Sequence, residues 1–278
     1  MKQFPIAIQL YSVREQAEMD FAGTMKALKE MGYSGVELAG TYGMTVAQVK
    51  EILDEVGLVL VSAHVGADLM WDDNLMADYA AAGMKYIAVP WFHKPTDAAF
   101  LEDNIDKFRV LGERCKSFGL QLGYHNHDFE LAEVPGDGRC ALEAYYEEIP
   151  ADLLKTQLDL CWVKVGGKDP VEFLKRFPGR APTVHFKDYA GGKTDKMYAL
   201  IDCDDKEASQ AATEFELRPV GYGCQDVKGL LEAAEEVGTE WIIVEQDEPS
   251  MGLGRLECAE KSIQYILSIM NEGGSDNG

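Results

Sequence analysis

Residues 35–65 read GVELAGTYGMTVAQVKEILDEVGLVLVSAHV, a stretch that holds one complete strand–helix–strand unit. Gly35–Ala39 and Val59–Val65 are short apolar runs with β-branched residues, a composition typical of strands. Val46–Val56 between them has the apolar spacing of an amphipathic helix, and Gly57 follows at the position where helices commonly end. Strands that alternate with helices in this way are expected to lie parallel in one sheet.

The same alternation continues along the 278-residue chain. Further strands are predicted at Ile6–Tyr11, Tyr86–Trp91, Gln121–His127, Thr156–Trp162, Thr183–Asp188 and Trp241–Asp247. Further helices are predicted at Phe21–Met31, Asp73–Ala82, Ala98–Phe118, Leu142–Glu148, Pro170–Arg176, Val227–Val237 and Cys258–Met270. Eight such units predict a single-domain (β/α)8 TIM barrel over residues 1–270, because a doubly wound sheet seldom needs so many regular repeats. A long irregular loop is predicted at about 190–225, and a disordered tail at 271–278.

Composition and charge exclude several classes of protein. Hydrophobic residues make up 46% of the chain, enough for a core, and no stretch approaches the roughly 18 apolar residues of a membrane helix. The first residues do not resemble a signal peptide, so the scattered cysteines predict thiols in a reducing compartment and a cytoplasmic location. A formal net charge of −22 opposes binding to nucleic acid, whose phosphates are neutralised by Lys and Arg. Small neutral ligands fit this charge best.

Polar and titratable side chains gather where the predicted strands end. The active site of a TIM barrel lies at the carboxyl ends of its strands, and residues i and i+2 of a strand point to the same face. All five histidines fall at or just beyond a predicted strand end, whereas a single strand histidine would more often be a core residue. Imidazole and carboxylate groups together suit a divalent metal. Strands five to eight each supply one predicted metal ligand: His125, Asp159, His185 and Glu245.

The other inward side chains are assigned to catalysis or to substrate binding. Glu245, His127 and His64 are the candidate general bases, and Lys187 is predicted to neutralise an oxyanion or to protonate a leaving oxygen. Glu37 either binds substrate, orients His64 or forms a structural ion pair within the barrel. The predicted substrate-binding residues are Gln9, Tyr11, Glu37, Trp91 and Asp247, with plain packing an equal alternative for Trp91.

Eight short motifs occur in order along the chain: IAIQLYSVRE, GYSGVELAG, SAHVG, YIAVPW, GYHNHDFE, QLDLCWVKVGGKDP, HFKD and VEQD. Together they resemble the sugar phosphate isomerase/epimerase family of xylose isomerase-like TIM barrels. The resemblance implies one divalent ion held by side chains of strands five to eight, with Mn²⁺ first and Zn²⁺, Co²⁺, Fe²⁺ or Mg²⁺ as alternatives. Ketose 3-epimerases of this superfamily carry LE on strand five, but this chain has YHNH with His125 in place of that glutamate. Strands with YHNH are similar to the inosose dehydratase branch and to relatives that act on oxidised sugars.

The chemistry that this resemblance implies begins with removal of a proton next to a carbonyl, through a metal-stabilised enediolate. The sequence favours a metal-dependent isomerase or epimerase of a small sugar or keto-sugar. The alternative is a lyase with the same site chemistry, either an inosose-type dehydratase or an enzyme that cleaves 3-keto-glycosides by β-elimination. An AP-type endonuclease, which needs a basic groove, and a non-catalytic sugar-binding subunit are weaker alternatives. The expected partner is a small carbohydrate or cyclitol, and a homo-oligomer or an accessory-subunit role is left open.

Overall fold

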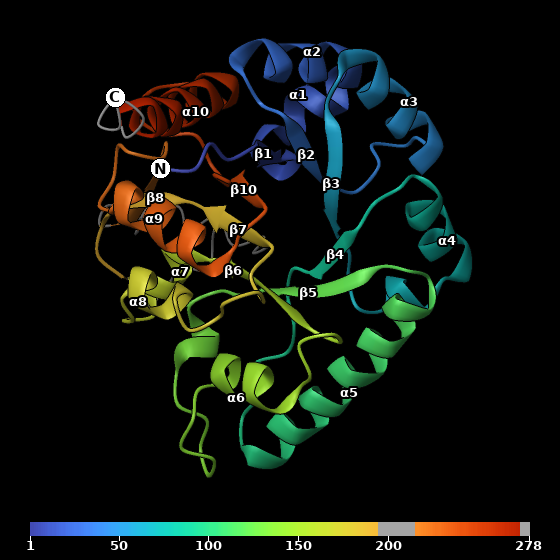
Figure 1. Cartoon of the computed structure of the whole chain (residues 1–278), viewed down its shortest axis with the longest axis vertical. Coiled ribbons are helices and arrows are strands. Elements are labelled where there is room, and N and C mark those ends of the chain that lie inside the picture. Colours follow the sequence, from blue (N-terminus) through green and yellow to red (C-terminus); the bar gives the residue numbers. More distant parts are fainter. Residues whose placement is uncertain (194–214, 273–278) are drawn as a thin grey trace, which may run out of the picture.

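Eight parallel strands close into a barrel in the computed structural model, which describes residues 1–193 and 215–272. Figure 1 shows the helices as a ring outside these strands. Consecutive strands of the barrel are hydrogen-bonded neighbours, and the last strand closes the barrel by pairing with the first. The barrel strands are β1 (Ile6–Gln9), β2 (Gly35–Ala39), β3 (Val59–His64), β4 (Tyr86–Val89), β5 (Gln121–His125), β6 (Lys155–Asp159), β7 (Thr183–Phe186) and β10 (Trp241–Val244). The predicted TIM barrel is therefore confirmed.

The helices lie between the strands, close to where the apolar periodicity predicts them. Within the described residues they are α1 (Arg14–Met19), α2 (Phe21–Met31), α3 (Val46–Val56), α4 (Asp73–Ala81), α5 (Ala98–Ser117), α6 (Ala141–Glu148), α7 (Leu160–Val165), α8 (Pro170–Leu174), α9 (Val227–Val237) and α10 (Arg255–Glu272). Short 3₁₀ turns follow three of the strands: η1 (Leu10–Val13), η2 (Leu69–Trp71) and η3 (Phe129–Leu131). In the described parts of the chain, no helix is both long and apolar enough to cross a lipid bilayer.

Several strands end earlier than predicted. The prediction of a strand through Trp162 is wrong, because β6 ends at Asp159 and α7 begins at the next residue. The Asp159 carboxylate accepts hydrogen bonds from the backbone N–H groups of Cys161 and Trp162, which caps this helix. The polar side chains that follow β1, β5, β7 and β10 likewise lie in loops or turns beyond the strands: Tyr11, His127, Lys187, Glu245 and Asp247.

The stretch predicted as an irregular loop at about 190–225 contains part of a hairpin. β8 (Asp188–Gly191) pairs antiparallel with β9 (Phe215–Arg218), so the prediction of irregular structure is wrong at both ends of that stretch. Tyr189 and Phe215 from this hairpin pack with Trp162 in a small buried cluster beside the barrel. The rest of the predicted loop, 194–214, and the last tail residues, 273–278, lie outside the described residues.

Asp188 holds the chain after the hairpin against the end of β7. Its fully buried carboxylate accepts five backbone hydrogen bonds, from the N–H groups of Tyr189, Gly221, Gly223, Cys224 and Gln225. A Cβ atom at Gly223 would lie 2.2 Å from Asp188 Oδ1, so only glycine allows this close approach.

We expect Asp188→Asn to lower the free energy of unfolding by about 3 kcal/mol, because an amide group cannot accept all of these bonds and leaves buried N–H groups unpaired. Urea unfolding followed by circular dichroism measures the loss. Asp226→Asn is the control, since Asp226 accepts a single backbone bond, from Gly229, at the exposed start of α9 and its replacement should cost about 1 kcal/mol or less. Equal losses in the two variants would contradict this account.

Candidate functional site

The interior of the barrel changes from apolar to polar toward the carboxyl ends of the strands. Ala7, Val61 and Ile243 form a small buried apolar cluster. Two residues further along the chain from Ala7 and Ile243 come Gln9 and Glu245, both buried and polar. These polar side chains therefore lie inside the barrel at the carboxyl ends of its strands, where TIM barrels carry their active sites.

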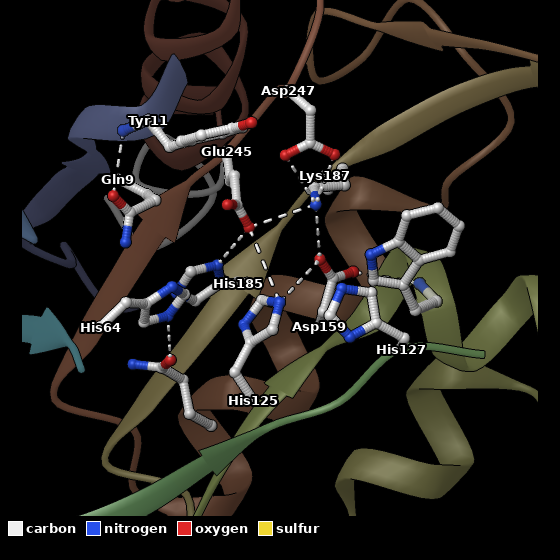
Figure 2. A network of polar contacts seen from close by, with 12 residues as sticks. Gln9, Tyr11, His64, His125, His127, Asp159, His185, Lys187, Glu245 and Asp247 are labelled. Atoms are coloured by element: carbon white, nitrogen blue, oxygen red, sulfur yellow. Dashed lines mark hydrogen bonds and ion pairs between the residues drawn. The ribbon is translucent and has the colours of Figure 1, made fainter. Parts of the chain in front are cut away.

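The four predicted metal ligands meet at this level. One nitrogen or oxygen atom from each of His125, Asp159, His185 and Glu245 lies within 4.8 Å of the others, and all four residues are buried. His125 Nε2 lies 3.9 Å from Asp159 Oδ2 and 3.9 Å from Glu245 Oε2, while His185 Nδ1 lies 2.8 Å from Glu245 Oε2. Figure 2 shows the four side chains converging from neighbouring strands.

Their atoms fit a divalent cation. Asp159 uses Oδ1 to cap α7, whereas its buried Oδ2 makes no hydrogen bond to any described residue. A buried carboxylate oxygen of this kind needs a positive charge close by, which is either the ammonium of Lys187, 3.2 Å away, or a metal ion. Two imidazoles and two carboxylates are a donor set suited to Mn²⁺, Zn²⁺, Co²⁺ or Fe²⁺. His64 also comes within 4.8 Å of His125 and His185, which makes a second group of possible ligands.

Lys187 places its side-chain ammonium at the edge of this cluster of candidate ligands. Its Nζ lies 3.2 Å from Asp159 Oδ2, 3.2 Å from Glu245 Oε2 and 3.1 Å from Asp247 Oδ2 (Figure 2). The same ammonium lies 5.3 Å from the centre of the Trp162 ring. Burial alone would lower the pKa of Lys187, but Asp247, Glu245 and Asp159 raise it well above its ordinary value. These carboxylates therefore favour the charged ammonium form of Lys187.

The residues of the cluster shift one another's pKa values. Burial opposes ionisation of Glu245, yet Lys187 and His185 hold its pKa well below the usual range. Burial would also lower the pKa of His185, but the carboxylates of Glu37 and Glu245 raise it to about 10. Burial, and then the neighbouring His185, lower the pKa of His125 well below its ordinary value. The site therefore holds charges of both signs in a region shielded from water.

The two histidines predicted as bases lie on opposite sides of the ligand cluster. Burial lowers the pKa of His127 to about 3, so its imidazole is neutral at neutral pH. Its ring packs edge-on against Trp91 at 4.9 Å and lies 5.7 Å from Trp162. His64 Nε2 lies 2.8 Å from Gln157 Oε1 and 3.0 Å from Glu37 Oε1.

The predicted substrate-binding residues divide into two groups. Trp91 is 44% exposed and Tyr11 is half-buried, and Asp247 contacts Lys187, so all three lie at or near the mouth. Gln9 and Glu37, in contrast, are fully buried, and the amide of Gln9 donates to Glu37 Oε1 over 2.8 Å. The structure does not bring these two to a surface that a substrate can reach. His93, the fifth histidine, is exposed and lies outside the groups of ligand atoms.

Sequence reasoning missed two buried residues, one that supports the ligand Asp159 and one that supports His127. Asn126 Oδ1 accepts the backbone N–H of Asp159 at 3.1 Å, which ties the end of β5 to the end of β6. Glu130 is buried, and its carboxylate accepts from Tyr124 Oη and from the backbone N–H of His127. The run HNHDFE, polar except for Phe129 and directly after an apolar stretch, was the available signal.

Glu130 should make folding stability depend on pH. Burial raises its pKa from 4.5 to about 7, so folding favours the protonated form. This contribution to stability is complete below the unfolded pKa and is lost as pH rises through about 7. Relative to wild type, Glu130→Gln should therefore gain up to about 3 kcal/mol between pH 4.5 and pH 8. Urea unfolding across that range measures the effect; a constant difference, or the same gain in the exposed control Glu133→Gln, would contradict it.

The sequence profile of the Xylose isomerase-like TIM barrel family matches residues 25–269. The chain belongs to this family. The resemblance inferred from the motifs is thereby confirmed. A protein named inosose dehydratase from Lacticaseibacillus casei is 24% identical over 283 residues, which cover 91% of each chain. The rhizopine catabolism protein MocC of Rhizobium meliloti is 26% identical over 81% of this chain and 74% of its own.

A solved structure shares the fold. A sugar phosphate isomerase/epimerase from Parabacteroides distasonis superposes with a TM-score of 0.76 at 21% identity, covering 95% of this chain and 94% of that one. At this level of identity the similarity establishes the barrel architecture. The activity has to be argued from the side chains of this chain's own site.

Proposed function

We propose that the chain is a metal-dependent lyase that removes water from a small keto-cyclitol or keto-sugar. The observation that carries this proposal is the pairing of a neutral imidazole with an ammonium in one buried site. His127 is held neutral by burial, Lys187 is held charged by carboxylates, and both side chains lie against Trp162. An inosose dehydratase among the relatives supports the same class of reaction.

The ligand cluster supplies the first requirement of this chemistry. His125, Asp159, His185 and Glu245 would hold one divalent ion, which when bound stabilises negative charge on the substrate carbonyl oxygen. Asn126 and the α7 cap fix the position of Asp159 before any ligand arrives. Preorganised groups of this kind need little rearrangement during the reaction, and that is where much of their benefit lies.

The remaining step is a transfer of two protons. His127 takes the proton from the carbon next to the carbonyl, and the electrons of that C–H bond form a carbon–carbon double bond as the β C–O bond breaks. Lys187 gives its proton to the departing hydroxyl, which leaves as water. His127 then releases the proton it has taken to solvent, and Lys187 takes up a proton from solvent, which returns both side chains to their starting states. Trp91 forms an apolar wall beside His127, against which the C–H face of the substrate ring can pack.

Isomerisation or epimerisation, which the sequence favoured, stays the second candidate. His64 supports it, because this imidazole lies on β3 and contacts His125 from the side opposite His127, at 4.8 Å between ring centres. Two bases on two faces of a substrate would allow a proton to be removed from one face and returned on the other. A dehydratase needs only one of them.

Incubation with Mn²⁺ and a panel of inososes, ketoses and 3-keto-glycosides in D₂O, followed by NMR and mass spectrometry, separates these reactions. We expect one substrate class to lose water. Any deuterium should then appear only in the dehydrated product or at positions that exchange with solvent. Deuterium at an α-carbon of a product with unchanged formula would instead establish isomerisation or epimerisation. If metal-replete protein changes no member of the panel, the proposed function is wrong. Asp169→Asn, a helix-cap variant outside the cluster, should behave as wild type.

A further inference from the structure

Glu37 lies beside the ligand cluster, and its carboxylate contacts side chains from four other strands. It is fully buried, and each of its oxygens has close partners from other strands. The contacts to Oε1 are Gln9 Nε2 at 2.8 Å, His185 Nε2 at 2.8 Å and His64 Nε2 at 3.0 Å; those to Oε2 are Ser62 Oγ at 2.6 Å and Gln157 Nε2 at 2.6 Å. No part of this carboxylate is left for a substrate.

We propose that Glu37 is a positioning residue that fixes how His185 and His64 face the site. His185 places Nε2 against Glu37 Oε1 and thereby turns Nδ1 toward Glu245, at 2.8 Å from its Oε2. His64 meets the same oxygen of Glu37, and the two imidazoles stack with ring centres 5.3 Å apart and 8° between their planes. One carboxylate therefore sets the orientation of a candidate ligand and of a candidate base.

The physical benefit concerns the ligand nitrogen. A carboxylate against the far nitrogen of an imidazole fixes the ring orientation and makes the near nitrogen a stronger donor toward a cation. Gln9, Ser62 and Gln157 hold the carboxylate itself, so the device joins β1, β2, β3, β6 and β7 across the barrel. The inference replaces the predicted substrate contact of Glu37, and it rests on the proposed metal site.

Two variants separate positioning from mere support of the fold. Glu37→Gln removes the charge but also sets its new amide N–H₂ against that of Gln157. The double variant Glu37→Gln with Gln157→Glu restores this hydrogen bond, because the new amide on β2 then donates to the new carboxylate on β6. That carboxylate also meets His64, whose Nε2 already lies 2.8 Å from Gln157 Oε1, but its charge has moved away from His185.

Isothermal titration of the metal-free full chain with Mn²⁺ and thermal unfolding of the same samples provide the test. We expect Glu37→Gln to weaken Mn²⁺ binding about 10- to 100-fold and to lower the melting temperature. The double variant should recover most of the melting temperature while Mn²⁺ binding stays weak. Recovery of wild-type affinity together with the melting temperature, or unchanged affinity in Glu37→Gln, would overturn the inference alone. Failure of the wild-type chain to bind Mn²⁺ would overturn the proposed metal site along with it.

Discussion

Asp159→Asn is expected to weaken Mn²⁺ binding by about a thousandfold and to abolish measurable turnover. The asparagine keeps the oxygen that caps α7 through Cys161 and Trp162, so the local fold should survive. What disappears is the charge on Oδ2, the oxygen that faces the other candidate ligands and the ammonium of Lys187. A carboxylate–cation contact in a buried site is worth several kcal/mol, and each 1.36 kcal/mol is about tenfold. Isothermal titration and the dehydration assay measure the two losses.

Asp169→Asn is the matched control for this variant. Asp169 also caps a helix, α8, by accepting the backbone N–H groups of Val171 and Glu172, but it belongs to neither group of candidate ligands. The same chemical change there should leave Mn²⁺ affinity and turnover at wild-type levels. Full metal occupancy in Asp159→Asn would remove the central assignment of the site.

The barrel and the convergence of the four candidate ligands were predictable from the sequence because both depend on repeated local patterns. Glycines at helix ends and apolar runs between them define the strand–helix units, and parallel neighbours place strand ends at one mouth. The register then aligns Asp159 directly with His185, as a prediction from adjacent strands requires. The sequence pattern is sufficient where the position of one side chain on each strand decides whether the candidate ligands meet.

The exact ends of strands were harder to predict, because side chains decide them. The apolar sequence after Asp159 reads equally well as more strand or as a buried helix, and the carboxylate that caps α7 selects the helix. Depth inside the barrel was also hidden, since period-2 alternation says that Glu37 faces inward but not how far it lies from solvent. Contacts between strands distant in sequence, such as those of Lys187 with Asp159 and Asp247, follow only from three-dimensional structure.

Lys187→Met should change turnover and metal affinity in opposite directions. Turnover should fall about 10²- to 10⁴-fold, because the leaving hydroxyl loses its proton donor. Mn²⁺ binding should strengthen at least about tenfold, because the ammonium lies 3.2 Å from Asp159 Oδ2 and 3.2 Å from Glu245 Oε2, where it repels an incoming cation. A residue that only supported the fold would lower both quantities together. Titration with Mn²⁺ and the dehydration assay on one preparation compare the two.

Lys193→Met provides the comparison for charge alone. Lys193 pairs with Asp128 at 2.6 Å, and its side chain is 56% exposed, so its removal should leave Mn²⁺ affinity close to that of wild type. Weaker Mn²⁺ binding in Lys187→Met would mean that this lysine holds the ligand carboxylates in place rather than competing for them. Unchanged turnover in the same variant would remove Lys187 as the proton donor, and with it the acid–base pair on which the proposed elimination depends.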